Sequence, residues 1–288
     1  MTDTPRGTTE SLQAEDWAGD MGAKWLANID RFEAMIAPVG AALLARAHYG
    51  PGDHVVDIGC GGGATTLAIA KSVAPEGIAV GIDISAELIA TAVARADAAG
   101  ITSVRFACAD AATCLAEEAP FDRLFSRFGS MFFPDPGTAF ANLRRSLKAG
   151  GRIDLAVWGP PRDNLWMMEI MGVVRQHIEV PPAIPRAPGP FAFEDVDYLN
   201  EILAAGGFGD VEIDTYEGLQ PVGGIDASAD EAVRFFLSSM SIGRLLDDQD
   251  PDLRRRVEQD LHAMFARHHQ PGQGVMMAGK AWLVSAIA

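Results

Sequence analysis

Three carboxylates accompany a glycine-rich turn in an order that suits the binding of a nucleoside-like ligand. Asp57 lies two residues before the glycines at residues 59–63, and Asp83 and Asp110 each end a later apolar segment. Glycines let a backbone approach a ligand closely, and a helix that follows them offers unpaired N–H groups. An acid about 20 residues past such glycines is positioned to accept both hydroxyls of a ribose. We therefore predict that Asp83 binds a ribose.

The other two acids suit the same ligand. An unpaired charge on Asp57 would be expensive to bury, so a partner such as loop amides or a ligand ammonium is expected. Asp110 could accept from an adenine amino group. Each acid also has a purely structural interpretation. Asp57 could pair with a helix N-terminus, and Asp83 and Asp110 could cap the helices that follow them. Ser85 is also a plausible cap for the helix after Asp83.

Strands and helices alternate around these residues. Apolar runs predict strands over residues 54–58, 78–82, 104–107, 121–125 and 152–157, and periodic segments predict helices over 64–73, 86–99 and 137–147, with a short helical segment over 112–118 and a turn at 150–151. Such an alternation indicates a parallel sheet covered on both faces. Ligands of these sheets bind at the carboxyl ends of the strands, where the three acids are expected to meet.

The flanking regions follow a different pattern. Residues 1–14 are expected to be disordered, and residues 15–50 to form lid helices, one over 16–36 and a second from Pro38 to residue 48. Residues 51–158 are predicted to be the core, and 159–193 a cap insertion over the substrate. Residues 194–288 are predicted to complete the core and to carry a helical insertion. Further helices are expected over residues 164–178, 194–205, 230–246 and 252–268, and a proline-rich loop over 181–190. Further strands are expected over residues 211–216 and 281–286.

Composition excludes several classes of protein. The net charge of −16 disfavours nucleic acid as a partner. The three cysteines have no disulfide-framework or metal-site spacing, so we expect no metal and a cytoplasmic location. The sequence contains no apolar run of about 18 residues, so no membrane span is expected. A small-molecule partner and a monomer or homodimer are expected.

The chain resembles the class I S-adenosylmethionine-dependent methyltransferases, especially small-molecule enzymes similar to those of ubiquinone and menaquinone biosynthesis. The pattern hydrophobic-hydrophobic-Asp-hydrophobic-Gly-x-Gly-x-Gly at residues 55–63 carries the resemblance, together with Asp83, the pair Asp110-Ala111, and the segments 121–127 and 147–152. The resemblance implies an α/β fold with a Rossmann-like, seven-stranded, mostly parallel sheet and an antiparallel last strand. N-terminal helices and helical insertions would form a substrate lid.

The same resemblance implies S-adenosyl-L-methionine as the cofactor and assigns residues to it. Asp57 would lie near its methionine end, and Trp17 would belong to the lid. The remaining implied contacts are Gly59, Cys60 and Gly61 along the cofactor, Asp83 and Ile84 at the ribose and adenine, Asp110 and Ala111 at the adenine, and Ser126 and Arg127 at the floor.

Aromatic residues follow the fourth and fifth predicted strands and are candidates for an acceptor pocket. They are Phe128, Phe132, Phe133, Trp158 and Trp166, and packing in the core is their alternative role. A pocket of this kind predicts a small, largely apolar or aromatic acceptor, with oxygen or carbon favoured. The Asn/Asp-Pro-Pro-aromatic signature is absent after the fourth strand, which disfavours methylation of DNA bases or of glutamine in proteins.

The sequence identifies no catalytic base. Positioning supplies much of the rate of methyl transfer from an activated donor, although an oxygen acceptor of high pKa also needs a base. No histidine is well placed, and His177 in the insertion is the best of a poor set.

Two other functions stay open. Gly59-x-Gly61-x-x-Ala64 is compatible with an NAD(P)-dependent oxidoreductase, although no Tyr-x-x-x-Lys pair occurs, and a SAM-binding protein could carry out chemistry other than methyl transfer.

Overall fold

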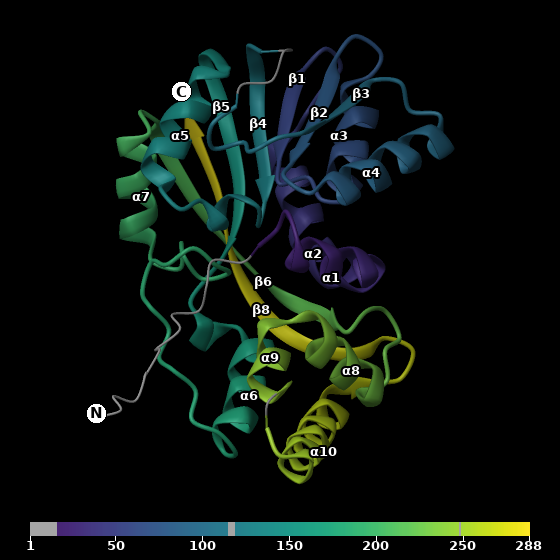
Figure 1. The fold of residues 1–288 in the computed structure, drawn as a ribbon. Coiled ribbons are helices and arrows are strands. Elements are labelled where there is room, and N and C mark those ends of the chain that lie inside the picture. The colour runs from purple at the N-terminus through teal and green to yellow at the C-terminus, as the bar shows by residue number, and fades with distance from the viewer. Residues whose placement is uncertain (1–15, 115–118, 248) are drawn as a thin grey trace, which may run out of the picture.

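The computed structural model describes residues 16–114, 119–247 and 249–288. The N-terminal segment expected to be disordered, and the end of the helical segment expected over residues 112–118, lie outside these ranges. Figure 1 shows a sheet lobe joined to a smaller lobe of helices. No helix in the described ranges is both long and apolar enough to cross a bilayer.

The sheet confirms the predicted class of fold. Its strands run in the order β3-β2-β1-β4-β5-β8-β6, and the two-residue β7 pairs with β8 beside this path. The first five strands are mutually parallel, whereas β8 is antiparallel to both β5 and β6. The strands are β1 (His54–Ile58), β2 (Ile78–Asp83), β3 (Val104–Cys108), β4 (Phe121–Arg127), β5 (Leu147–Trp158), β6 (Gly209–Val222), β7 (His269–Gln270) and β8 (Gly274–Ile287).

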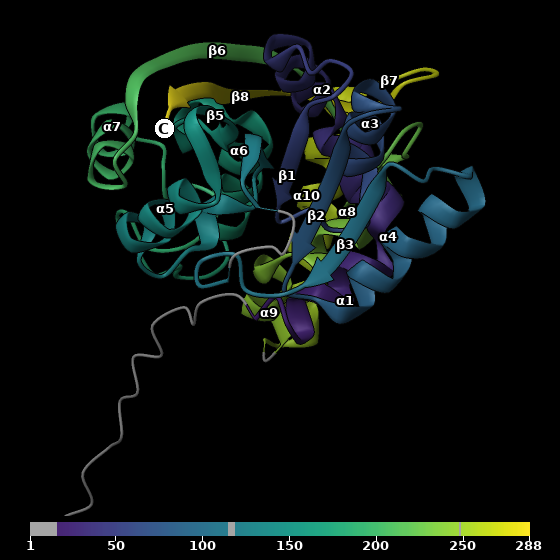
Figure 2. The ribbon, with the colours of Figure 1, turned by 90° about the horizontal axis from the view of Figure 1, so that it is seen from above.

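Helices cover both faces of the sheet. Figure 2 shows α3 (Ala64–Val73) and α4 (Ala86–Ala99) on one side, and α5 (Pro136–Arg145) and α7 (Val196–Ala205) on the other. The strands between them are apolar because both of their faces are buried. Phe121 and Phe125 of β4 are fully buried, as is Phe140 of α5.

The second lobe is built on the far ends of β6 and β8, which continue well past the predicted strands at 211–216 and 281–286. Gly218 pairs with Gly279 and Val222 with Val275 along this extension. Glycines and Pro221 concealed it in the sequence, but β6 is an edge strand, where a proline is tolerated. The lobe consists of α6 (Leu165–Arg175), α8 (Ala229–Ser239), α9 (Ser241–Asp247) and α10 (Pro251–His268).

Three element boundaries differ from the sequence-based predictions. The predicted first helix is split at Asn28 into α1 (Asp20–Ala27) and α2 (Ile29–Ala47), and Pro38 lies inside α2 rather than at the start of a helix. The predicted helix over 230–246 is likewise interrupted at Met240. The glycines at 150–151 form no separate turn, because they lie inside β5, where the register with β4 shifts and Gly150 has a φ of +75°.

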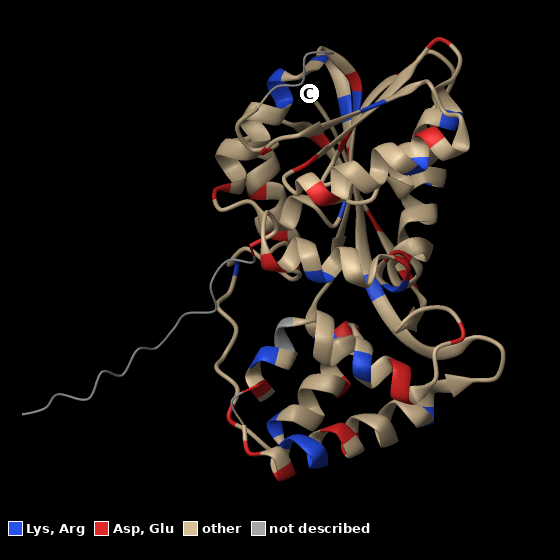
Figure 3. Cartoon of the chain, turned by 45° about the vertical axis from the view of Figure 1, so that its right-hand side comes forward, with Lys and Arg blue, Asp and Glu red and all other residues tan. Residues whose placement is uncertain are grey.

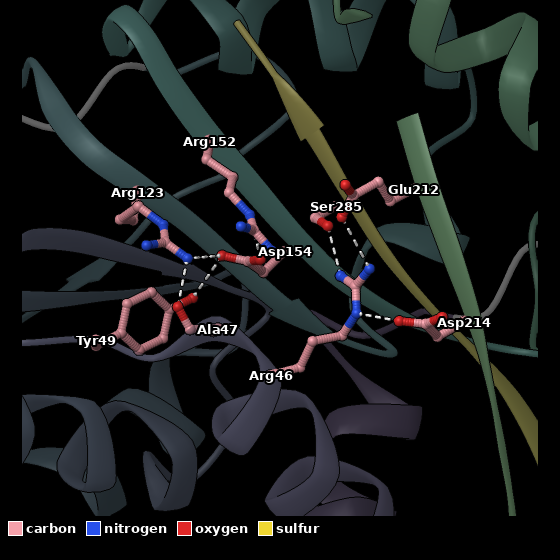
Figure 4. A network of polar contacts seen from close by, with 9 residues as sticks. All are labelled: Arg46, Ala47, Tyr49, Arg123, Arg152, Asp154, Glu212, Asp214 and Ser285. Atoms are coloured by element: carbon pink, nitrogen blue, oxygen red, sulfur yellow. Dashed lines mark hydrogen bonds and ion pairs between the residues drawn. The ribbon is translucent and has the colours of Figure 1, made fainter. Parts of the chain in front are cut away.

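A polar network attaches the C-terminal end of α2 to the sheet (Figure 4). Arg46 donates to Ser285 Oγ on β8 and, at 2.7 Å, to Asp214 Oδ2 on β6. The fully buried Asp154 of β5 accepts from Arg123 Nη2 at 2.7 Å and from Tyr49 Oη at 3.2 Å. These contacts fix the helix whose other end reaches the cavity described next.

Candidate functional site

A cavity of about 680 Å³ lies at the carboxyl ends of the central strands, where α1, α2 and α6 approach them. Most of the residues predicted for cofactor and acceptor binding line it. They are Trp17, Gly59, Cys60, Gly61, Asp83, Ile84, Asp110, Ala111, Arg127, Phe128, Phe132, Phe133, Trp158 and Trp166. Segments distant in the sequence therefore converge on a single site.

The glycine turn requires its glycines. Gly59, Gly61 and Gly63 have φ values of +69°, +54° and +82°, which side-chain-bearing residues rarely adopt. A Cβ on Gly59 would come within 2.7 Å of Gly129 Cα. The turn thus packs directly against the segment after β4 and presents bare backbone to the cavity.

Asp83 connects the end of β2 to this turn. Its Oδ2 accepts from the Gly61 N–H at 2.8 Å and its Oδ1 from the Ser85 N–H at 2.9 Å. Burial raises the pKa of Asp83, and the two backbone hydrogen bonds partly oppose this effect. A carboxylate has about four acceptor positions, so both oxygens can still accept from a ribose. The adjacent Ile84 is 44% exposed and offers an apolar surface to a planar ring.

Asp110 stabilises a turn of the protein and also lines the cavity. Its Oδ1 accepts from the Ala112 N–H at 2.9 Å, so it stabilises the turn after β3. The residue also lines the cavity together with the buried Ala111. The second carboxylate oxygen has no partner in the described residues and is available to a donor on the ligand.

Two of the residues expected at the cofactor, Asp57 and Ser126, do not line the cavity. Both are buried beneath it. Asp57 Oδ2 accepts from the hydroxyls of Thr65 and Thr66 at 2.8 and 2.7 Å, which ties β1 to the first turn of α3. Ser126 donates to Ile58 O at 2.9 Å and so joins β4 to β1. Both residues shape the floor from below.

The environment of Asp57 is electrostatically unusual. Its Oδ1 is buried and has no hydrogen-bond partner in the described residues. Burial raises its pKa to about 6, although the two threonine hydroxyls and the positive charge of Arg127 lower it. The carboxyl group is therefore held near its protonation midpoint at mildly acidic pH.

Arg127, at the end of β4, is a half-buried cation at the cavity wall. No hydrogen bond or ion pair joins it to another residue in the described ranges, and its Nε is buried without a partner. Burial lowers its pKa, and the charges of Asp57 and Glu33 oppose that shift. Gly40 of α2 makes room for it, since a Cβ there would lie 2.9 Å from Arg127 Cδ. Buried charges normally have partners, so this guanidinium suits an anionic group on a ligand.

Glu33 is a site residue that the sequence did not reveal. It lies on α2, lines the cavity, and accepts from Arg95 Nη1 at 2.7 Å. The same Arg95 nitrogen donates to Gly62 O at 3.0 Å, so the pair connects α2 to the glycine turn. A lone acid on an amphipathic helix is ordinarily a solvent-facing residue, and no local motif marks this one.

The aromatic residues predicted for the acceptor line the cavity and also pack in the core, where Phe128, Trp158 and Trp166 are at most 7% exposed. The rings of Phe128 and Trp158 are stacked, with centroids 4.1 Å apart and planes at 14°. Phe132 meets Trp17 edge-on at 4.9 Å. Phe128 has a φ of +63°, and for a residue other than glycine such a backbone costs on the order of 1–3 kcal/mol and is common at functional sites.

The described residues contain no cluster of three or more side chains suited to a metal, and no histidine lines the cavity. His177, which follows α6, pairs with Asp260 of α10 at 2.7 Å, and His268 of α10 pairs with Glu169 of α6 at 2.9 Å. These histidines hold the helices of the second lobe together and are not positioned as catalytic bases.

Comparison with known proteins identifies the core of the chain. Residues 55–151 match a family model described as a methyltransferase domain. Residues 55–151 are therefore similar to a methyltransferase domain. The matched segment contains the glycine turn, Asp83, Asp110 and Arg127, whereas α6 to α10 lie outside the match.

Relatives and solved structures agree with this assignment. The nocamycin O-methyltransferase of Saccharothrix syringae is 33% identical over 124 residues, which are 43% of this chain and 44% of that protein. The aklanonic acid methyltransferase DauC of a Streptomyces species is 33% identical over 116 residues, 40% of this chain and 53% of that protein. The chain thus spans only about half the length of these relatives. The crystal structure of YcgJ from Bacillus subtilis superposes with a TM-score of 0.57 at 19% identity, over 87% of this chain and 98% of that one, which shows a shared fold.

Proposed function

We propose that this protein transfers the methyl group of S-adenosyl-L-methionine to a small, largely apolar or aromatic acceptor, with oxygen or carbon as the favoured acceptor atom. One observation carries the proposal. A single cavity brings the glycine turn and Asp83 of the matched segment together with the aromatic rings of Phe128, Trp158 and Trp166. A donor and an acceptor that share this cavity would be in contact.

The residues on the glycine-turn side fit the cofactor group by group. Asp83 would offer acceptors to the ribose hydroxyls, Asp110 would accept from the adenine amino group, and Ile84 and Ala111 would flank the adenine ring. At the other end, the partnerless guanidinium of Arg127 suits the α-carboxylate. The carboxylate of Glu33 suits the α-ammonium.

These residues act by binding and orientation. When bound, S-adenosyl-L-methionine supplies a methyl group on a sulfonium, which is already activated for in-line displacement. The stacked pair Phe128 and Trp158 would hold a flat acceptor with its nucleophilic atom toward that methyl group, and apolar walls would exclude water. Holding two reactants in line can lower a barrier by about 7–11 kcal/mol, so a site without an evident base can still accelerate the reaction.

The acceptor class has independent support. The two relatives named as methyltransferases for nocamycin and for aklanonic acid favour a small-molecule acceptor, and the first name specifies oxygen. Figure 3 shows basic residues interspersed with acidic ones in both lobes, and the net charge of −16 disfavours nucleic acid. The cysteines at 60, 108 and 114 are free, which suits a reducing compartment. A cytoplasmic location and a monomer or homodimer are part of the same proposal.

Calorimetric titration with S-adenosylhomocysteine tests the first half of this proposal. We expect a dissociation constant between about 1 and 100 µM, and no binding at about 1 mM would overturn the proposal. Radiolabelled S-adenosyl-L-methionine with a panel of phenols, quinols and polyketides tests the second half. Cofactor binding without turnover of any acceptor would favour SAM-dependent chemistry other than methyl transfer, and binding of NADH instead would favour an oxidoreductase.

A further inference from the structure

Methionines are concentrated around the cavity. The chain has eleven methionines. Seven of them line this cavity, namely Met21, Met35, Met131, Met167, Met168, Met171 and Met240. Of the others that the structure describes, Met264 lies in α10, and Met276 and Met277 lie in β8, and none of the three lines the cavity. Four of the five tryptophans also lie there, so the site combines rigid rings with flexible thioethers.

Five of these methionines come from the segments that supply the acceptor end. Met131 lies in the 3₁₀ turn η1 (Ser130–Phe132) after β4, and Met240 lies between α8 and α9. Met167, Met168 and Met171 belong to α6, the helix that also supplies Trp166 and Ile170. These five side chains therefore come from elements around the predicted acceptor rather than from one packed layer.

Burial distinguishes the α6 methionines from methionines of the core. Met264 and Met277 are fully buried, with 1% and 0% of their surface exposed. Met168 is 40% exposed, and Met167 and Met171 are only partly buried. The α6 methionines thus lie beside open cavity volume, where their side chains have space to change rotamer.

The chemistry of methionine gives this arrangement a function. Its side chain is unbranched, with three rotatable bonds and a polarizable sulfur, so it fits irregular shapes and makes favourable contacts with aromatic rings. Proteins that bind several partners use methionine-rich surfaces in this way. The stacked rings of Phe128 and Trp158, with planes at 14°, are by contrast a fixed flat surface.

We propose that Met167, Met168, Met171 and Met240, but not the fully buried Met131, form an adaptable wall that lets the acceptor site take flat apolar ring systems of different size. The aromatic pair selects flat molecules, and the methionines repack around their edges. This inference rests on the proposed function, because it concerns the acceptor end of the same site. It adds that acceptor specificity is set by shape and planarity and tolerates variation in ring number.

Methionine methyl resonances test the wall directly. Protein labelled with [methyl-¹³C]methionine is saturated with S-adenosylhomocysteine and titrated with 2-naphthol and, separately, with 1-hydroxypyrene. We expect the methyl signals of Met167, Met168 and Met171, assigned by single Met→Leu variants, to shift with both ligands and to reach different positions. The signals of Met264, Met276 and Met277 should stay in place, since these residues lie outside the cavity.

A triple variant tests specificity. Leucine has a similar volume to methionine but is stiffer, so M167L/M168L/M171L should still bind 2-naphthol. The ratio of its affinities for 2-naphthol and 1-hydroxypyrene should differ from that of the parent protein by about tenfold. M276L is the matched control and should leave the ratio unchanged. The inference would be overturned if the affinity ratio of the triple variant equalled that of the parent protein. It would also be overturned if S-adenosylhomocysteine bound but the α6 methyl signals did not shift with either ring compound. Failure of S-adenosylhomocysteine itself to bind would overturn the proposed function instead.

Discussion

The carboxylate of Asp83 accepts a hydrogen bond from the backbone N–H of Gly61, with 2.8 Å between Oδ2 and N. The acid that we propose for the ribose therefore also fixes the turn that carries the rest of the cofactor. A second bond, from the Ser85 N–H to Oδ1, positions the first turn of α4. Ligand binding and loop geometry are thus coupled through one side chain.

Substitution of Asp83 by asparagine should weaken binding of S-adenosylhomocysteine by about 10- to 100-fold. The charge-assisted bonds to the ribose hydroxyls are lost, whereas the amide oxygen can still accept from Gly61. Calorimetry measures the effect, and circular dichroism checks that the fold is retained. Asp97→Asn, in the outer part of α4, is the matched control. An affinity within about twofold of the parent protein would remove Asp83 from the ribose site.

Arg127 gives a sharper prediction because two ligands can be compared. Arg127→Gln should weaken binding of S-adenosylhomocysteine by about 10- to 100-fold, since a charged bond to the carboxylate is lost. Binding of 5′-methylthioadenosine, which has no amino acid group, should be nearly unchanged. Arg127→Lys keeps the charge and should fall between the two proteins. Equal losses for both ligands would indicate a structural role for Arg127 and contradict the assignment.

Sequence reasoning succeeded where the signal is local. The predicted segments 54–58, 64–73 and 86–99 coincide with β1, α3 and α4. Each is bounded by glycines, a proline or a capping residue, and Ser85 indeed caps α4. The glycine turn and Asp83 belong to this stretch, so their position at the cavity was predictable.

The errors arose where tertiary contacts determine the outcome. The extension of β6 depends on β8, since Gly218 pairs with Gly279, which is far away along the chain. Asp57 was expected at the ligand, but the hydroxyls of Thr65 and Thr66 satisfy one of its oxygens below the floor. Side-chain direction at a strand end depends on such neighbours and not on spacing.

Stability should depend on pH through Asp57. Its pKa is about 6 in the folded protein and 3.8 as the ordinary value, so the folded state binds the extra proton between these values. Stability therefore falls as pH rises through this window, by about 3 kcal/mol in total and by about 1.5 kcal/mol between about pH 5 and about pH 7.5. Asp57→Asn has no proton to lose, so it acquires no buried charge as pH rises and should lack this decline.

Urea denaturation of both proteins at the two pH values measures the difference. Other titrating groups contribute equally to the parent and the variant, so the comparison isolates Asp57. Asp97→Asn again serves as the control and should follow the parent protein. Parallel stability profiles for the parent and Asp57→Asn would show that this carboxyl titrates near its ordinary pKa.

The final prediction concerns Asp154, which supports the helix that carries Glu33 and Gly40. Asp154 is fully buried and accepts from Arg123 at 2.7 Å and from Arg152 at 3.0 Å. Asp154→Asn should lower the free energy of unfolding by about 1–3 kcal/mol, because it leaves two partly buried guanidinium groups without a counter-charge. Glu217→Gln is the control, since Glu217 is 69% exposed in its pair with Lys280, and an exposed pair contributes only about 0–1 kcal/mol.

A second variant separates loss of the pair from loss of packing. Removing all three charges in R123M/R152M/D154L leaves no unpaired guanidinium, so the triple variant should be more stable than Asp154→Asn. Urea denaturation ranks the proteins. If Asp154→Asn is no less stable than Glu217→Gln, the network does not hold α2 on the sheet. In that case the position of Glu33 must depend on its own bond to Arg95, at 2.7 Å, rather than on the far end of the helix.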